Sequence, residues 1–284
     1  QEGDQVEILS GVFGGRTTGT PIALEVRNTD QRSHDYSNIM DIYRPGHADY
    51  TFDEKYGFRD YRGGGRSSGR ETIGRVAAGA IAARLLKSLG ITVCAYTKAV
   101  GPYEADPAQF DPEEMYRNRL YMPDAGAAAL AEAYLDRMMS ECNSVGGVVE
   151  CVIDGLPAGV GDPVFEKYDA SLAKAILSIG AVKGFEIGDG FQAAKSVGSE
   201  NNDAFRMDES GKIKKETNHA GGILGVPSAP ESYLPSHHTA PEWQQPHRFL
   251  PLSVQEADAL FPHSRAPAPL LSPQPGGLPL WLSA

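Results

Sequence analysis

The feature that most constrains the fold is a glycine- and arginine-rich segment that runs directly into an apolar helix pattern. Residues 59–75 read RDYRGGGRSSGRETIGR. The apolar residues that follow at helical spacing are Ile73, Val76, Ala77, Ala80, Ile81 and Leu85. Gly90 provides a stop, because glycine readily adopts the left-handed conformation that ends helices. The pattern predicts a helix over residues 70–89, with the glycines before its N-terminus.

The start of this helix has the chemistry of an anion site. Ser68 and Glu71 fit the S-x-x-E capping box, which places Ser68 at the N-cap. The first turn of a helix leaves N–H groups unpaired, and the glycines at 63–65 let the backbone approach a ligand. Forked guanidinium donors are supplied by Arg62, Arg66 and Arg70. The segment predicts a site for phosphate or carboxylates; the alternative is an ordinary glycine-rich turn with solvated arginines.

A histidine lies shortly upstream of this segment. The run RPGHADYTFDEKYG contains Arg44 and His47. A histidine beside a phosphate site can donate a proton to a leaving group near neutral pH, whereas a lone histidine is more often structural or solvated. His34 and His219 fit either interpretation, and the pair 237–238 is interpreted as solvated. His47 is therefore the candidate acid, and no spacing typical of a metal site is found.

Composition narrows the classes of protein. The chain has 284 residues, 41% of them hydrophobic, and a formal net charge of −11. This size fits one large domain or two smaller ones, and the charge argues against nucleic acid or an anionic membrane as the main partner. Cys94, Cys142 and Cys151 form no CxxC pair, so we expect no disulfide framework and a reducing, cytoplasmic compartment. The sequence has no apolar run that could span a membrane, and its N-terminal residues lack a signal-peptide pattern.

Strand and helix patterns alternate without a regular βαβ repeat. The sequence predicts a hairpin at 6–28, strands at 91–100, 146–159 and 182–191, and further helices at 127–143 and 168–181. We therefore expect an α+β fold in which a sheet packs against helices.

The chain changes character near residue 225. Residues 226–284 hold 12 of the 20 prolines and no lysine. Because proline removes a backbone donor and fixes φ, this tail is predicted to be irregular or disordered. It fits the product of a shifted reading frame or an alternative exon; the alternative is a natural proline-rich interaction tail. The expected organisation is a core over 1–225 and a tail over 226–284.

Several collinear segments resemble the chorismate synthase family over residues 4–225. They are SGVFGGRTTGTPIAL, NTDQRSHDYSNI, RPGHADYTFDEKYGFRDYRGGGRSSGRETIGRVAAGAIA, GLPAGVGDPVFEKYDASLAKAILSIGAVKGFEIGDGF and NHAGGILG. The resemblance implies a β-α-β sandwich core, here incomplete. It also implies a lyase of the shikimate pathway of aromatic amino acid biosynthesis, which converts 5-enolpyruvylshikimate 3-phosphate to chorismate and phosphate by a trans-1,4 elimination. The resemblance further implies reduced FMN as cofactor, NADP as an associated nucleotide, a homotetramer, and a cytosolic or plant-plastid location.

The same resemblance implies site residues. Contacts to FMN would come from the RSS run, from a pair that matches a family Asn-Ala, and from a glycine of GGILG: Arg66, Ser67, Ser68, Gly180, Ala181 and Gly225. His47 matches one of two family histidines and would assist departure of phosphate. Arg44 and Arg70 would meet the phosphate or carboxylates of the substrate.

Three family motifs do not occur in the sequence: GESHG, with the second histidine, and the KPTPS and GRHDP types. The first candidate function is the family's lyase reaction, with little or no turnover expected from the chain as written. The second is an inactive fragment or isoform that binds flavin or co-assembles without turnover. The third, argued from the residues alone, is a phosphate-sugar or nucleotide-binding module without chemistry.

Overall fold

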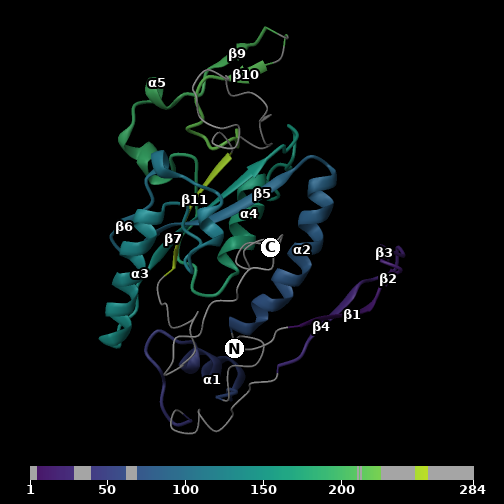
Figure 1. Ribbon diagram of the computed structural model, residues 1–284, viewed down its shortest axis with the longest axis vertical. Helices are drawn as coiled ribbons and strands as arrows, with labels where there is room; N and C mark the ends of the chain where they lie inside the picture. The colour runs from purple at the N-terminus through teal and green to yellow at the C-terminus, as the bar shows by residue number, and fades with distance from the viewer. Residues whose placement is uncertain are drawn as a thin grey trace. The chain divides into compact units, whose positions relative to one another are not determined.

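The structure, a computed structural model, covers most of the region before residue 225 and one strand beyond it (Figure 1). The residues that it describes are 5–28, 40–61, 69–209, 211, 213–224 and, as a backbone strand, 247–254. The chain divides into two compact units, residues 1–77 (unit 1) and residues 78–284 (unit 2).

Unit 1 contains the predicted hairpin and a short helix. Its outer strands pair antiparallel, with Val6 opposite Val26 and Ile8 opposite Leu24, and a small two-stranded tip completes the reversal. The elements are β1 Val6–Ser10, β2 Val12–Phe13, β3 Arg16–Thr17, β4 Ala23–Val26 and α1 Asp49–Tyr56. The hairpin predicted at 6–28 is confirmed.

The predicted apolar helix is present as α2, Thr72–Ser88, preceded by a 3-10 turn at Gly69–Glu71. It ends in a Schellman motif, in which Ile91 N donates to Leu86 O at 2.9 Å and Gly90 N donates to Lys87 O at 3.1 Å. Gly90 has φ +81°, the left-handed conformation that the motif requires. The predicted stop at Gly90 is confirmed.

The main element of unit 2 is a five-stranded antiparallel sheet with the order β6-β5-β7-β11-β8 (Figure 1). Its longest pairing joins β5 to β7, from Thr92 opposite Asp154 to Val100 opposite Gly147. The strands are β5 Thr92–Val100, β6 Tyr103–Glu104, β7 Gly147–Asp154, β8 Glu186–Ile187 and β11 His247–Val254. The three predicted strands are confirmed, the last of them with only two residues.

Helices pack on this sheet through two apolar clusters. One lies between β5 and α3 and consists of Val100, Ala105, Met122, Ala127, Ala128 and Ala131. The other, the isoleucine cluster, consists of Ile91, Ile153 and Ile223, and Leu86 of α2 and Leu172 of α4 pack against it. The remaining elements are α3 Ala125–Ser140, α4 Tyr168–Leu177, α5 Gly198–Asn201, β9 Phe205–Met207, β10 Ile213–Lys215 and 3-10 turns at Pro107–Gln109, Glu114–Tyr116 and Gly190–Lys195. The fold is α+β, as predicted.

Several helix ends differ from the prediction. The helix predicted at 127–143 ends at Ser140, and Cys142 beyond it has φ +53°. Two further ends have clear local reasons. Helix α3 starts before residue 127 because Asp124 is its N-cap, with Oδ1 accepting from Gly126 N at 2.8 Å and Ala127 N at 3.1 Å. Helix α4 ends at Leu177, and Ala181 has φ +68°, which is incompatible with a helix that continues to that residue.

A buried carboxylate lies on one face of the sheet. Glu150 of β7 is 2% exposed. Tyr96 Oη donates to Glu150 Oε1 at 2.8 Å, and Lys98 Nζ lies 3.0 Å from Oε2. Tyr96 is directly opposite Glu150 in the β5–β7 register, so the three side chains share a face. These contacts compensate the loss of water around the carboxylate.

Strand β11 lies in the segment that was expected to be irregular. It pairs with β7 on one side and β8 on the other. The pairing with β7 shifts register between Phe249 and Leu252, so Pro251, which has no N–H to donate, falls within the irregularity. For residues 247–254 the expectation of irregular backbone is therefore corrected. The division of the chain at residue 225 stays a prediction.

Replacing Gly155 by alanine is expected to destabilise unit 2. A Cβ there would overlap Gly90 O, and φ is +78°. Gly159→Ala is the matched control, because Gly159 has φ +96° but no atom within 4 Å of its Cβ position. We expect the control to lose about 1–2 kcal/mol through backbone strain and Gly155→Ala about 3 kcal/mol or more. Urea unfolding followed by circular dichroism measures both, and equal losses would contradict the steric argument.

Candidate functional site

The RPGH run of unit 1 forms a tight turn in front of α1. His47 N donates to Arg44 O at 3.2 Å, and Gly46 has φ +76°. Proline followed by glycine with positive φ is typical of a type II turn. The turn leaves His47 exposed to solvent, where it could exchange protons with a ligand or with water.

Arg44 forms a forked ion pair with Asp49. Its Nε and Nη2 donate to the two carboxylate oxygens, both at 2.9 Å, and its backbone N donates to Oδ2 at 3.0 Å. The hydrogen bonds from Arg44 lower the pKa of Asp49 to about 2, against a smaller opposing effect of burial, and the charges of Arg44 and Arg59 act in the same direction. The structure thus gives Arg44 a carboxylate partner within the chain.

Arg59 holds the preceding loop against α1, a role that no pattern in the sequence indicated. Its side chain is 8% exposed, and Nη2 donates to Met40 O at 2.7 Å and Ile42 O at 3.0 Å. The guanidinium also stacks over the Tyr43 ring, 4.9 Å from the centroid. Its ion-pair distance to Asp49 is 3.8 Å. Arg59 therefore fixes the backbone that presents Arg44 and His47.

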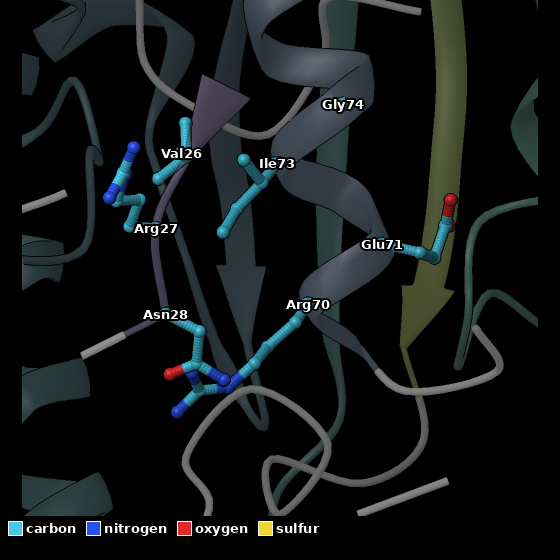
Figure 2. Close-up of a pocket in the computed structure, with 7 residues that line it drawn as sticks. All are labelled: Val26, Arg27, Asn28, Arg70, Glu71, Ile73 and Gly74. Atoms are coloured by element: carbon cyan, nitrogen blue, oxygen red, sulfur yellow. The ribbon is translucent and has the colours of Figure 1, made fainter. Parts of the chain in front are cut away.

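A pocket of about 260 Å³ lies between the end of β4 and the start of α2 (Figure 2). It is lined by Val26, Arg27, Asn28, Arg70, Glu71, Ile73 and Gly74. Figure 2 shows the side chains of Arg70 and Asn28 extending toward the same end of the pocket, whereas Arg27 and Glu71 point away from that end. Glu71 accepts from Arg75 Nε at 2.9 Å, so its charge is paired. A guanidinium and an amide at one end of a pocket, at a helix start, suit an anion.

In unit 2, Gly180 and Ala181 form an open turn after α4. Ala181 is left-handed, and no heavy atom lies within 4 Å of a Cβ built on Gly180. Backbone exposed in this way can contact a flat ring such as that of a flavin. The residues present at this turn therefore fit the cofactor that the resemblance implies.

The GDG and NHAGG segments of unit 2 meet through their backbones. Asp189 N donates to His219 O at 2.7 Å. A Cβ on Gly188 would overlap His219 O, and a Cβ on Gly221 would overlap Gly188 N, so only glycine allows this approach. The contact joins two segments that carry the family resemblance but lie far apart in the sequence.

Comparison with known proteins identifies the family. The family model described as chorismate synthase matches residues 1–234. The chain belongs to the chorismate synthase family.

Relatives and a solved structure agree with this assignment. The chorismate synthase of Agathobacter rectalis is 66% identical over 225 residues, which cover 79% of this chain and 61% of the relative. That of Lachnoclostridium phytofermentans is 63% identical with the same coverage. A crystal structure of a chorismate synthase superposes with a TM-score of 0.69 at 28% identity, covering 88% of this chain and 72% of the other. The chain thus spans 61% of the length of these two curated chorismate synthases.

The site residues that the resemblance to chorismate synthases predicted in this chain fall into three groups. Arg44 and His47 share one turn, and Arg70 lines the pocket of the same unit. His47 is not among the residues that line that pocket. Gly180 and Ala181 lie together in unit 2. The remaining residues, Arg66, Ser67, Ser68 and Gly225, lie outside the described part of the chain.

Two negative observations apply to the described residues of this chorismate synthase family member. Within them, no helix is both long and apolar enough to cross a membrane. The same part of the chain contains no cluster of three or more histidine, cysteine, aspartate or glutamate side chains that could hold a metal ion.

The Arg44–Asp49 pair should make the fold acid-sensitive. Because the pKa of Asp49 is about 2 in the fold against an ordinary 3.8, its stabilisation is complete above about pH 4 and is lost as the pH falls toward 2. Asp49→Asn should lower the free energy of unfolding by about 1–2 kcal/mol at pH 7 and flatten this part of the pH dependence. Asp53→Asn is the control, because Asp53 has a 3.9 Å contact with Arg59 and a hydrogen bond with Tyr43 but no guanidinium fork. Urea titrations between pH 2 and 7 test this, and an unchanged acid limb in Asp49→Asn would count against it.

Proposed function

We propose that this chain binds reduced FMN and 5-enolpyruvylshikimate 3-phosphate and serves the chorismate synthase reaction. In that reaction phosphate leaves in a trans-1,4 elimination and chorismate is formed. The observation that carries the proposal is the pocket in which Arg70 and Asn28 extend to one end, beside the start of α2, in a member of this family. A phosphorylated dicarboxylate suits such a pocket, because guanidinium forks bind phosphate and carboxylate oxygens in pairs.

The residues have distinct roles in this proposal. Arg70 and Asn28 hold an anionic group of the substrate, and the exposed His47 gives a proton to the departing phosphate. Arg44 serves the substrate by fixing the turn that carries His47, or by exchanging Asp49 for a substrate carboxylate. Reduced FMN, when bound, would supply an electron transiently, with no net redox change. The residues that would hold it are Arg66, Ser67, Ser68, Gly180, Ala181 and Gly225.

The proposal extends to assembly and location. A homotetramer in the bacterial cytoplasm is the expected form, and NADP enters only through reduction of the flavin. The second candidate is a chain that binds flavin, or co-assembles with longer subunits, without turnover. It is suggested by the family motifs GESHG, KPTPS and GRHDP, which do not occur in the sequence.

The Arg70 pocket can be tested with its own matched control. Arg70→Leu should weaken binding of 5-enolpyruvylshikimate 3-phosphate by about tenfold or more, because a charge-assisted fork contributes at least about 1.5 kcal/mol. Arg27→Leu removes the other arginine of the pocket, which points away from Asn28, and should change affinity by less than about twofold. Calorimetric titration in the presence of FMN measures both. Equal effects of the two substitutions would contradict the assigned geometry.

Turnover separates the two candidate functions. Chorismate formation is measured with FMN kept reduced by dithionite, alongside flavin binding followed by absorbance. The absent motifs lead us to expect flavin binding with little or no chorismate. Robust chorismate formation that is lost in His47→Asn would instead establish the first candidate. Absence of flavin binding would remove the first candidate and leave only co-assembly with longer subunits from the second.

A further inference from the structure

The carboxylate of Asp203 in unit 2 is the centre of a buried hydrogen-bond network. Its side chain is 2% exposed. Oδ1 accepts from His219 N at 2.7 Å and Thr217 Oγ1 at 2.8 Å, and Oδ2 accepts from Ala220 N at 3.0 Å. Burial raises the pKa of Asp203, but the bonds from Ala220, Thr217 and His219 and the charge of Lys215 outweigh it, so the net shift is downward. Asp203 is therefore ionised at neutral pH.

The same oxygen orients the imidazole of His219. His219 Nδ1 lies 3.0 Å from Asp203 Oδ1, which also accepts from the backbone N–H of His219. An ionised carboxylate only accepts hydrogen bonds, so Nδ1 carries the hydrogen. In a neutral imidazole with Nδ1–H, Nε2 is an acceptor. The side chain is 29% exposed, which gives a ligand access to the ring.

The charge of Asp203 is already balanced without the histidine. Lys215 Nζ lies 3.4 Å from Asp203 Oδ2 and donates to Asn218 Oδ1 at 2.6 Å, and its side chain is 6% exposed. Because Lys215 supplies the compensating positive charge, the network does not require an imidazolium. The neutral ring, with a free acceptor at Nε2, is compatible with this arrangement.

The backbone keeps His219 in place. Its carbonyl accepts from Asp189 N at 2.7 Å, and the glycines at 188 and 221 are packed backbone to backbone beside it. Ile223, shortly afterwards in the chain, belongs to the isoleucine cluster. Asp203 already orients the ring, and the sheet already holds the turn. Ligand binding therefore costs little further conformational entropy at His219.

We propose that His219 is a further ligand-binding residue of this protein, held by Asp203 so that its Nε2 accepts a hydrogen bond from an N–H or O–H group of a bound ligand. The choice of ligands rests on the proposed function: reduced FMN offers ring N–H groups, and 5-enolpyruvylshikimate 3-phosphate offers a hydroxyl. Asp203 acts as the positioning residue. Neither residue is among those that the family resemblance assigned to the site.

The first measurement determines which nitrogen of the His219 ring carries the hydrogen. Long-range proton–nitrogen NMR spectra of the full chain, labelled with 15N-histidine, report the tautomer of His219 directly. We expect Nδ1–H in the wild type and a mixture of tautomers in Asp203→Asn, because the amide can donate as well as accept. His219 in the Nε2–H form in the wild type would overturn the proposal.

The ligand step uses FMN reduced with dithionite and 5-enolpyruvylshikimate 3-phosphate as separate probes. We expect the Nε2 resonance of His219 to move with at least one of them, and the probe that moves it identifies the donor. His219→Asn is the matched variant, since its amide nitrogen replaces Nδ1 as donor to Asp203 while Nε2 is lost. It should keep the wild-type melting temperature and weaken the same ligand at least about fivefold.

A resonance that responds to neither probe, or wild-type affinity in His219→Asn, would overturn the proposal. Flavin absorbance separates this from failure of the proposed function. If FMN binding perturbs the flavin spectrum but the Nε2 resonance of His219 moves with neither probe, only the proposed role of His219 is wrong. If neither probe binds at all, both proposals are wrong.

Discussion

The antiparallel pairing of β5 with β7 is the interaction on which the rest of unit 2 depends. It brings residues 92–100 beside residues 147–154 and continues outward to β6 on one side and β11 on the other. One end of the pair contributes Val100 to the cluster with α3, and Ile153 contributes to the isoleucine cluster. Each buried isoleucine stabilises the fold by about 1.5–3 kcal/mol. Through Ile223 the same sheet also holds the NHAGG turn, so the geometry around His219 is a product of the core.

Local patterns predicted the elements well, because their causes lie close together in the sequence. The Schellman motif at Gly90 needs only a glycine after an apolar period, and the hairpin at 6–28 needs only a turn between two strands. The predicted helix ends were wrong where a single residue determines where the helix starts or stops. Asp124 moved the start of α3, and Ala181 lies beyond the earlier end of α4. The place of β11 in the sheet depends on long-range pairing, which proline content alone does not reveal.

The candidate site was predictable only in part, for a related reason. Arg70 was expected to face an anion and lines a pocket with Asn28, but nothing in the spacing of the sequence linked Asn28 to it. Arg44 was expected to meet the substrate, and in the structure it is paired with Asp49, because a guanidinium fork has the same geometry for an internal carboxylate as for a ligand. The contacts of Asp203 with His219 span 16 residues and carry no local signal. The functional roles of all the site residues predicted from the sequence, including Arg66, Ser67, Ser68 and Gly225, stay predictions.

The buried Glu150 has a consequence for how the strands find their alignment. If β7 slipped by one residue along β5, its two faces would exchange, and the carboxylate would leave Tyr96 and Lys98 and enter the side occupied by Ile91 and Ile223. An unpaired buried charge costs about 3–5 kcal/mol, a large share of the stability of an ordinary domain. In a strand with only apolar side chains, the same one-residue slip would cost less free energy. The buried carboxylate thus makes a shifted pairing of β5 with β7 less stable than the native one.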